Sequence, residues 1–238
     1  GFTPQMFHQL GAAYKRLEDD PELRVGVLFA HGKHFTAGLD LPKFAATMRD
    51  GKPLIPNGGI DPFALSAPYR SKPVVTAVKG ICYTAGIELM LATEIVVAAE
   101  GTRFSQLEVG RGVMAVGGAT VRMTERAGWG NAMRILLTSC EFTPDDALRY
   151  HFIQEIVPAG RELDRALELA ADICRQILAA APGHAGASHL LGVASLQQRD
   201  TAAAERLIAD ALRRGPATAP MHCNHGSALL ELGRLPEA

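Results

Sequence analysis

The chain has 238 residues, of which 47% are apolar, so it can build a sizeable core in one domain or two. Its formal net charge of −1 gives no electrostatic case for nucleic acid or an anionic membrane as a partner. Four widely spread cysteines without a CxxC predict free thiols in the cytoplasm, and argue against disulfides or a zinc site. We find no apolar run of membrane-spanning length and no leader-like N-terminus. The missing initiator Met predicts a fragment.

The first part of the chain alternates helix and strand signals. A helical apolar pattern begins at Thr3-Pro4, a favourable helix start, and continues to about Glu18. Residues 24–30 are a short apolar run, which predicts a buried strand of a mainly parallel sheet. Residues 31–40 then form a strand-to-helix turn. Residues 45–72 carry several Pro and Gly, so we predict an irregular segment with at most one short helix, typical of a binding loop.

The middle of the chain continues this alternation. We predict a strand at 73–78, a helix at 86–92 and a strand at 95–99. A glycine-rich loop at 116–120 opens a further helix to about residue 127. Such a loop could bind phosphate, but it lacks Gly-Lys-Ser/Thr and the dinucleotide fingerprint, so we interpret it as close helix packing. The remaining elements are predicted at 131–138 (helix), 143–150 (helix), 152–157 (strand) and 161–173 (helix).

Two acidic residues in this stretch stand in apolar surroundings. Glu88 follows the small-residue turn Thr84-Ala85-Gly86, and Glu108 follows Phe104-Ser105-Gln106-Leu107. A carboxylate is costly to bury unpaired, so two of them beside apolar runs suggest a paired acid/base site. The alternative is that both are solvated, as most charged side chains are.

This segment resembles the active-site half of the crotonase family, the enoyl-CoA hydratases and isomerases. Glu88 and Glu108 are twenty residues apart, as in that family, and residues 104–108 match its F-x-Q-x-E pattern. Residues 34–41 (HFTAGLDL) resemble its F-S-A-G-x-D-L turn, and residues 117–122 resemble its G-G-x-x-R segment. The resemblance implies an α/β fold, a crotonase-like spiral of ββα-type turns that begins after the family's first strands.

The resemblance also implies a role for individual residues. Glu88 and Glu108 would be the catalytic acids, with Glu88 orienting and activating water and Glu108 transferring a proton to C2. The backbone amides of Leu39 and Ala85 would form an oxyanion hole. Most relatives have Gly at the position of Ala85. Further substrate-binding positions would be Ala37, Gly38, Asp40, Thr84 and Gly86.

The implied reaction is the syn addition of water to a 2-enoyl thioester of coenzyme A, with the developing enolate held by the oxyanion hole. Coenzyme A would be part of the substrate, and neither a metal nor a redox cofactor is implied. Relatives of this kind are homotrimers or hexamers. Two retained glutamates favour a hydratase over members with one acid, but an isomerase remains an alternative. No G-x-S-x-G elbow or Cys-His pairing competes with this interpretation.

Past residue 173 we expect the resemblance to end, because the sequence begins to repeat itself every 34 residues. Three pairs of residues are 34 apart: Pro182 and Pro216, Gly192 and Gly226, and Ala204 and Ala238. This period is typical of tetratricopeptide repeats, which predicts one full repeat at 185–218, a second from 219, and the end of a preceding one at 174–181. We therefore predict a crotonase-like acyl-CoA domain at 1–173 and a partial tetratricopeptide-repeat segment at 174–238.

The join leaves two other hypotheses open. The first is a non-catalytic crotonase core carrying a repeat adaptor for a peptide or protein partner. The second is a chimaera joined near Ile173 with no selected joint function. Histidines also gather in the tail, but they lack four-ligand spacing, so we interpret them as helix residues rather than metal ligands. His31 and His34 are interpreted as loop histidines.

Overall fold

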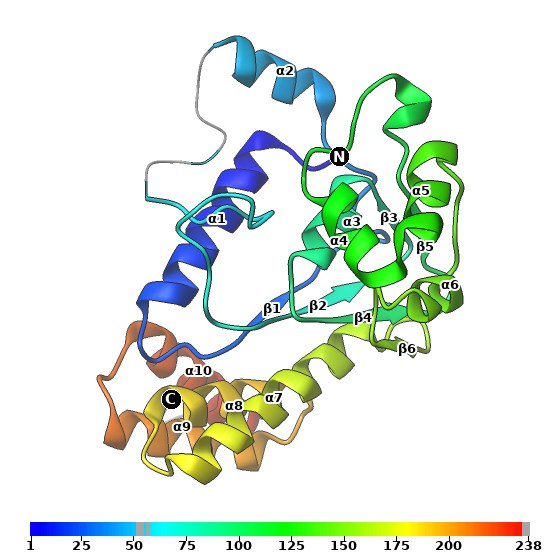
Figure 1. The fold of residues 1–238 in the computed structure, drawn as a ribbon. Coiled ribbons are helices and arrows are strands. Elements are labelled where there is room, and N and C mark those ends of the chain that lie inside the picture. Colours follow the sequence, from blue (N-terminus) through cyan, green and yellow to red (C-terminus); the bar gives the residue numbers. More distant parts are fainter. Residues whose placement is uncertain (51–54, 56–57, 235–238) are drawn as a thin grey trace. The chain divides into compact units, whose positions relative to one another are not determined.

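The computed structural model describes residues 1–50, 55 and 58–234 of the chain (Figure 1). These residues form two compact units, Gly1–Glu18 with Val27–Ala166 and Asp19–Gly26 with Leu167–Ala238. The units divide the chain between residues 166 and 167, before the predicted boundary at 173. The second unit also takes the short segment that follows the first helix.

The elements of the chain alternate in the way that the sequence predicts. They are α1 (Pro4–Asp19), β1 (Gly26–Leu28), α2 (Leu41–Arg49), β2 (Val74–Val78), β3 (Ile81–Tyr83), α3 (Ala85–Leu91), β4 (Ile95–Ala99), β5 (Arg103–Ser105), the 3-10 turn η1 (Val109–Arg111), α4 (Ala119–Ala127), α5 (Trp129–Thr138), α6 (Pro144–Arg149), β6 (Glu155–Val157), α7 (Glu162–Ala180), α8 (Ala185–Gln197), α9 (Thr201–Arg214) and α10 (Ala219–Glu231). Strands β3 and β5 were not predicted, because with three residues each they are too short to show alternation.

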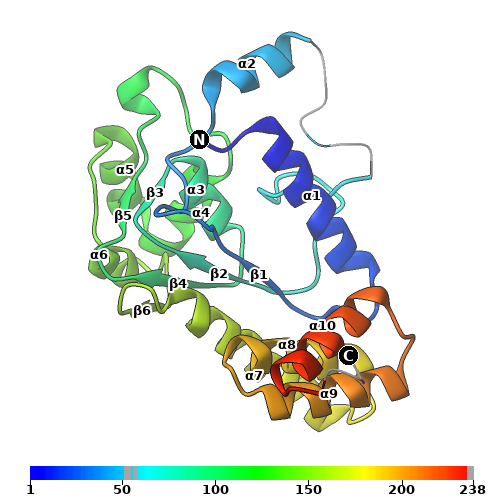
Figure 2. The ribbon, with the colours of Figure 1, turned by 180° about the vertical axis from the view of Figure 1, so that it is seen from behind.

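A four-stranded sheet has the order β1-β2-β4-β6. Strands β2 and β4 are parallel, as are β4 and β6, and Val75 lies opposite Ile95. Strands β2 and β4 run side by side in both views (Figures 1 and 2). All five residues of β2 are buried, which is why this strand reads as a continuous apolar run. The mainly parallel sheet is therefore confirmed.

A second, two-stranded sheet pairs β3 with β5 in parallel, with Cys82 opposite Phe104. Parallel strands end at the same edge of a sheet, so the segments that follow them begin close together. Helix α3 follows β3, and Glu108 follows β5. A hydrogen bond from the Thr84 amide to the Ser105 carbonyl, 2.9 Å long, joins the two strands at this edge. This small sheet thus brings the two acidic segments together.

The apolar core of the first unit lies beneath α3, where Ile87 and Met90 are fully buried. Phe104 from β5 stacks on Phe142 with ring centroids 5.3 Å apart, and both rings belong to this core. Burying one such side chain stabilises a fold by roughly 1.5–3 kcal/mol. The core therefore holds the strands and helix that carry the acids in a fixed arrangement.

The second unit contains the helices α8, α9 and α10, which the repeat pattern predicted as helical. Helix α8 packs closely on α9, because a Cβ atom on Gly192 would lie 2.6 Å from the Cγ1 of Ile208. One predicted helix boundary is wrong. Residues 174–180 are the end of a helix, as predicted, but this helix is α7, which is continuous with the helix predicted at 161–173 because no Gly or Pro interrupts the pattern before Pro182. No helix in the described ranges is long and apolar enough to cross a membrane.

Candidate active site

Helix α3 carries two of the predicted site residues, Ala85 and Glu88, and all seven of its residues are buried. Thr84 before it has a positive φ of 51°, a strained conformation that turns the chain sharply from β3 into the helix. Gly86 is required at this turn, because a Cβ there would lie 2.8 Å from the Cγ2 of Thr36. The predicted substrate-binding residue Gly86 thus has a packing role.

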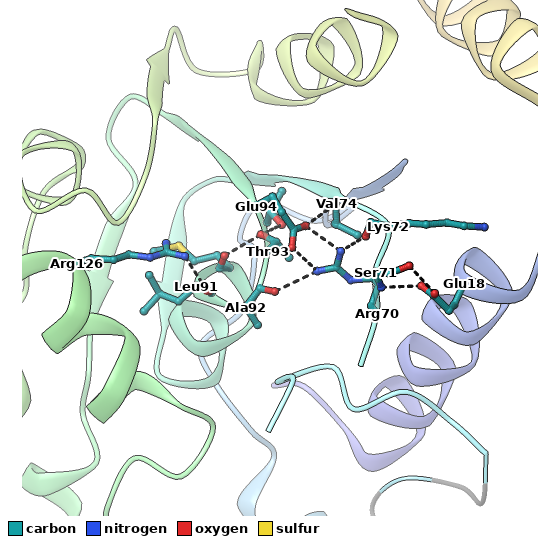
Figure 3. A network of polar contacts seen from close by, with 12 residues as sticks. Glu18, Arg70, Ser71, Lys72, Val74, Leu91, Ala92, Thr93, Glu94 and Arg126 are labelled. Carbon is teal, nitrogen blue, oxygen red and sulfur yellow. Dashed lines mark hydrogen bonds and ion pairs between the residues drawn. The ribbon is translucent and has the colours of Figure 1, made fainter. Parts of the chain in front are cut away.

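The C-terminal end of α3 is held by two arginine side chains (Figure 3). Arg126 donates to the Leu91 carbonyl at 2.9 Å, and Arg70 donates to the Ala92 carbonyl at 3.2 Å. Arg70 also pairs with Glu94 at 2.9 Å. The last carbonyls of a helix have no partner within it, and cations there are favourable to the helix dipole. These contacts fix the helix, and therefore the position of Glu88.

Glu88 is only 3% exposed. Its Oε1 accepts hydrogen bonds from the amides of Gly117 at 2.6 Å and Ala119 at 3.3 Å. Burial raises the pKa of Glu88 to about 7; the Glu108 charge adds to this rise, while the two amides and Arg122 oppose it. A carboxyl group with this pKa can take up or release a proton near neutral pH.

Glu108 comes two residues after Gln106 and forms the N-terminal boundary of η1. Its Oε2 is buried and has no hydrogen-bond partner in the described part of the chain. Burial also raises the pKa of Glu108, and its own backbone amide and the charge of Arg111 act in the opposite direction. Glu108 therefore offers an unoccupied carboxyl oxygen whose proton is held more tightly than usual.

The two predicted oxyanion-hole residues, Leu39 and Ala85, lie close together. The residues before them are in contact, because a Cβ on Gly38 would lie 1.9 Å from the Thr84 Oγ1. Gly38 has a φ of 105°, which only glycine adopts readily. The Phe2 amide donates to the Gly38 carbonyl, and the Asp40 amide donates to the Phe2 carbonyl. The Leu39 amide lies between these two bonded groups and therefore points away from Phe2. Ala85 is the first residue of α3, so its amide has no partner within the helix.

One cavity of about 760 Å³ collects these groups. Leu39, Ala85, Glu88 and Glu108 all line it. Of the other predicted positions, Ala37 and Thr84 line it, whereas Gly38, Asp40 and Gly86 do not.

Asp40, one of the predicted substrate-binding residues, has another partner. Its carboxylate pairs with Lys43 at 2.8 Å, and its amide donates to the Phe2 carbonyl. Lys43 lowers the pKa of the Asp40 carboxyl. These contacts shape the turn that presents the Leu39 amide.

Most of the remaining cavity wall is apolar, and includes Phe7, Phe44, Phe63 and Leu65. Asp61 also lines the cavity, but its carboxylate accepts hydrogen bonds from its own loop, including the Phe63 amide at 2.9 Å and the Leu65 amide at 3.1 Å. Asp61 and Arg111 line the cavity but were not predicted as site residues. The Asp61-Pro62 dipeptide, a turn signal, could have indicated the first of them.

Three of the eight histidines have structural partners that account for them. His34 accepts a hydrogen bond from the Ile81 amide at 3.1 Å, and His184 caps α8 by accepting from the Ala187 amide at 3.1 Å. His225 faces Glu205 at 3.5 Å. These contacts agree with their interpretation as loop and helix residues.

A family model described as enoyl-CoA hydratase/isomerase matches residues 1–199. The chain therefore belongs to the enoyl-CoA hydratase/isomerase family. The match continues past residue 173, so the prediction that the resemblance ends there is wrong. Amphipathic helix patterns look alike in different helical folds, which explains why the helices after 173 gave no family signal.

Several named relatives are similar to this chain. The mevalonyl-coenzyme A hydratase SIDH of Beauveria bassiana is 34% identical over 179 residues, covering 71% of this chain and 64% of the relative. The enoyl-CoA hydratase EchA19 of Mycobacterium tuberculosis is 31% identical over 172 residues, with the same two coverages. The chain thus spans 64% of the length of these curated relatives.

A solved structure resembles the whole chain. It is a probable enoyl-CoA hydratase/isomerase from Mycobacterium abscessus, with 38% identity and a TM-score of 0.72, and the match covers 100% of this chain and 88% of that one. A carnitinyl-CoA dehydratase from Mycobacterium avium 104 gives a TM-score of 0.64 at 28% identity, with 92% and 90% covered. The crotonase-like α/β fold is therefore confirmed.

Proposed function

We propose that this chain is an enoyl-CoA hydratase that adds water to a 2-enoyl thioester of coenzyme A. The observation that carries the proposal is that one cavity is lined by two carboxyl groups with raised pKa values, Glu88 and Glu108, and by the two residues whose amides would form the oxyanion hole. Family membership and the hydratases among its relatives support the same reaction.

In this proposal the thioester carbonyl oxygen accepts hydrogen bonds from the amides of Leu39 and Ala85. As the water oxygen bonds to C3, the electron pair of the C2–C3 double bond moves towards the carbonyl and the oxygen becomes an enolate. Amides aimed at that oxygen stabilise the charge where it develops; in acyl-transfer enzymes, removing one such donor costs about 3 kcal/mol. Ala85 also lies at the start of α3, where the positive end of the helix dipole adds to the effect.

The two glutamates divide the proton transfers. Glu88, held by two amides, orients the water and accepts its proton as the bond to C3 forms. Glu108, with its unoccupied Oε2, gives a proton to C2 as the enolate collapses. The two carboxyl groups interact, so they titrate as a coupled pair whose apparent pKa values describe both groups together. Coenzyme A is part of the substrate, and we propose no further cofactor.

The test is hydration of crotonyl-coenzyme A, followed as loss of the enoyl-thioester absorbance. We expect the wild type to be active and the Glu108→Gln variant to be inactive, with exposed Glu100→Gln as the matched control. Mass analysis separates this reaction from isomerisation, because hydration adds one water to the product. Loss of turnover in neither Glu108→Gln nor Glu88→Gln would overturn the site assignment.

We also propose the finer organisation of the chain: an acyl-CoA domain, a partial tetratricopeptide-repeat segment formed by the helices that follow α7 within the second unit, and a homotrimer or hexamer in the cytoplasm. The close packing of Gly192 on Ile208 supports a repeat-like helical hairpin. A peptide or protein is the partner that such a hairpin would bind. Sedimentation of the full chain tests the oligomer, and a pull-down that compares the wild type with Gly192→Leu tests the hairpin.

A further inference from the structure

The Gly117–Gly118 turn lies between Glu88 and Arg122. A Cβ on Gly117 would lie 2.4 Å from the Oε2 of Glu88, and a Cβ on Gly118 would lie 2.1 Å from the Nη1 of Arg122. Gly118 also has a φ of 103°. Only two consecutive glycines allow both side chains to approach the turn this closely.

The guanidinium group of Arg122 holds two separate segments. It donates to the Gly117 carbonyl at 3.2 Å, to the Phe63 carbonyl at 2.6 Å and to the Ala64 carbonyl at 3.2 Å. Phe63 lines the cavity, and Ala64 has a strained φ of 50°. A planar guanidinium can bond several carbonyls at once, which an ammonium group cannot do with the same geometry.

The residues held at the far side form a wall of the cavity. We call residues 61–66 the wall loop. Its inner contacts are made by Asp61, whose carboxylate accepts from the Leu65 amide at 3.1 Å and the Ser66 hydroxyl at 3.2 Å. Arg122 binds the same loop from outside, through the Phe63 and Ala64 carbonyls. Arg122 also binds the Gly117 carbonyl, and the Gly117 amide donates to Glu88 at 2.6 Å. One side chain thus connects the wall loop to the carboxylate.

We propose that Arg122 is a positioning residue that couples the wall loop to Glu88 through the Gly117–Gly118 turn. A substrate acyl group that contacts Phe63, whose carbonyl Arg122 binds across 59 sequence positions, would then bias the orientation of the Glu88 carboxylate. This inference deepens the proposed function and rests on it. The charged groups that face Glu88 are Glu108 and Arg122, with Asp61 and Arg111 further along the same cavity wall.

The kinetic test uses Arg122→Met and Arg122→Lys. We expect kcat for crotonyl-coenzyme A to fall about 10²-fold in Arg122→Met, because misplacing a reacting group by about 1 Å has an effect of that size. Arg122→Lys keeps the charge but not the three-carbonyl geometry, so kcat should fall by about tenfold, with KM changed less than kcat. Equal kcat values in the wild type and both variants would overturn the proposal.

The pH profile separates positioning from a general loss of folded protein. The charge of Arg122 lowers the pKa of Glu88, so its removal should move the limb of the kcat/KM profile that reports Glu88 to higher pH. Arg122→Lys should leave that limb in place. A variant that was merely less folded would lower the rate at every pH and leave the limb where it is, and that result would count against the proposal.

Two measurements complete the design. A ¹³C titration of the glutamate carboxyl groups, with Glu88 assigned by its absence in Glu88→Gln, reads the Glu88 pKa without turnover. A higher midpoint in Arg122→Met supports the coupling of Arg122 to Glu88 even if the wild type does not hydrate crotonyl-coenzyme A. Failure of this proposal can therefore be distinguished from failure of the proposed hydratase function. An unchanged midpoint overturns the coupling. A double-mutant cycle of Asp61→Asn with Arg122→Lys should be non-additive in kcat, whereas additive effects would show that the wall loop and Glu88 are not coupled.

Discussion

The segment around Glu88 is far more enclosed than the segment around Glu108. Every residue of α3 is buried, whereas none of the three residues of η1, which follows Glu108, is buried. Glu88 accepts two amide hydrogen bonds, while the Oε2 of Glu108 has no partner among the described residues. A carboxylate fixed by amides is suited to orienting a water, and one with an unoccupied oxygen is suited to passing a proton to the substrate.

Both acids nevertheless have raised pKa values for the same main reason, burial of the carboxyl group. The surrounding charges differ, because Arg122 opposes the rise at Glu88 and Arg111 opposes it at Glu108. Each acid thus has its own arginine. A raised pKa can thus arise both in a fully enclosed segment and in an exposed one, and variants can test each segment separately.

The largest expected effect on kcat comes from changing Glu108, the less enclosed of the two acids. Glu108→Gln removes the proposed proton donor without changing the shape of the side chain, so we expect kcat to fall by about 10³-fold. The measurement is crotonyl-coenzyme A hydration at saturating substrate, with circular dichroism to establish that the variant is folded. A rate within tenfold of the wild type would show that Glu108 is not the proton donor.

A smaller loss of kcat is expected from Gly117→Ala, which changes the turn beside the enclosed Glu88. The new Cβ would lie 2.4 Å from the Oε2 of Glu88 and would force the carboxylate or the turn to move. We expect kcat to fall by about 10²-fold. The matched control is Gly130→Ala, where a Cβ meets nothing within 4 Å, and its kcat should equal that of the wild type. Equal rates in both variants would contradict the close fit of the turn.

The third prediction concerns stability and pH. The pKa of Glu88 is about 7 in the folded chain against an ordinary value of 4.5, so between these values the folded state keeps a proton that the unfolded chain has lost. The free energy of unfolding should therefore fall as pH rises through this interval, by up to about 3 kcal/mol. Urea titrations at pH 5 and 8 should show a smaller fall in Glu88→Gln. The same fall in both proteins would mean that Glu88 is not the group responsible.

Much of the arrangement was predictable from the sequence. The pairing of Glu88 with Glu108 was predicted from their apolar surroundings and from the crotonase family, in which the two acids are also twenty residues apart, and the structure brings both to one cavity. The parallel strands and α3 followed from apolar runs bounded by glycine and proline. The strands and α3 are local features, because each depends on a few neighbouring residues.

The features that were missed depend on residues far apart in the chain. Arg122 reaches the Phe63 carbonyl across 59 positions, and a backbone carbonyl leaves no trace in the sequence. Likewise, Asp61 is a cavity residue whose carboxylate is already occupied by its own loop, which only the folded geometry reveals. The continuous helix α7 was missed for a different reason, since a repeat period was given more weight than the absence of helix breakers.

The smallest expected effect lies in the second unit and tests whether its packing is independent of the site. Gly192→Ala would place a Cβ 2.6 Å from the Cγ1 of Ile208 and 3.2 Å from the Ala204 carbonyl oxygen. Overpacking costs about 1–3 kcal/mol, and the better helix propensity of Ala returns up to about 1 kcal/mol. We therefore expect the unfolding free energy to fall by about 1 kcal/mol in a urea titration, with kcat unchanged. A fall in kcat as large as that of Gly117→Ala would show instead that helix packing in the second unit affects the positions of Glu88 and Glu108. The site would then depend on both units.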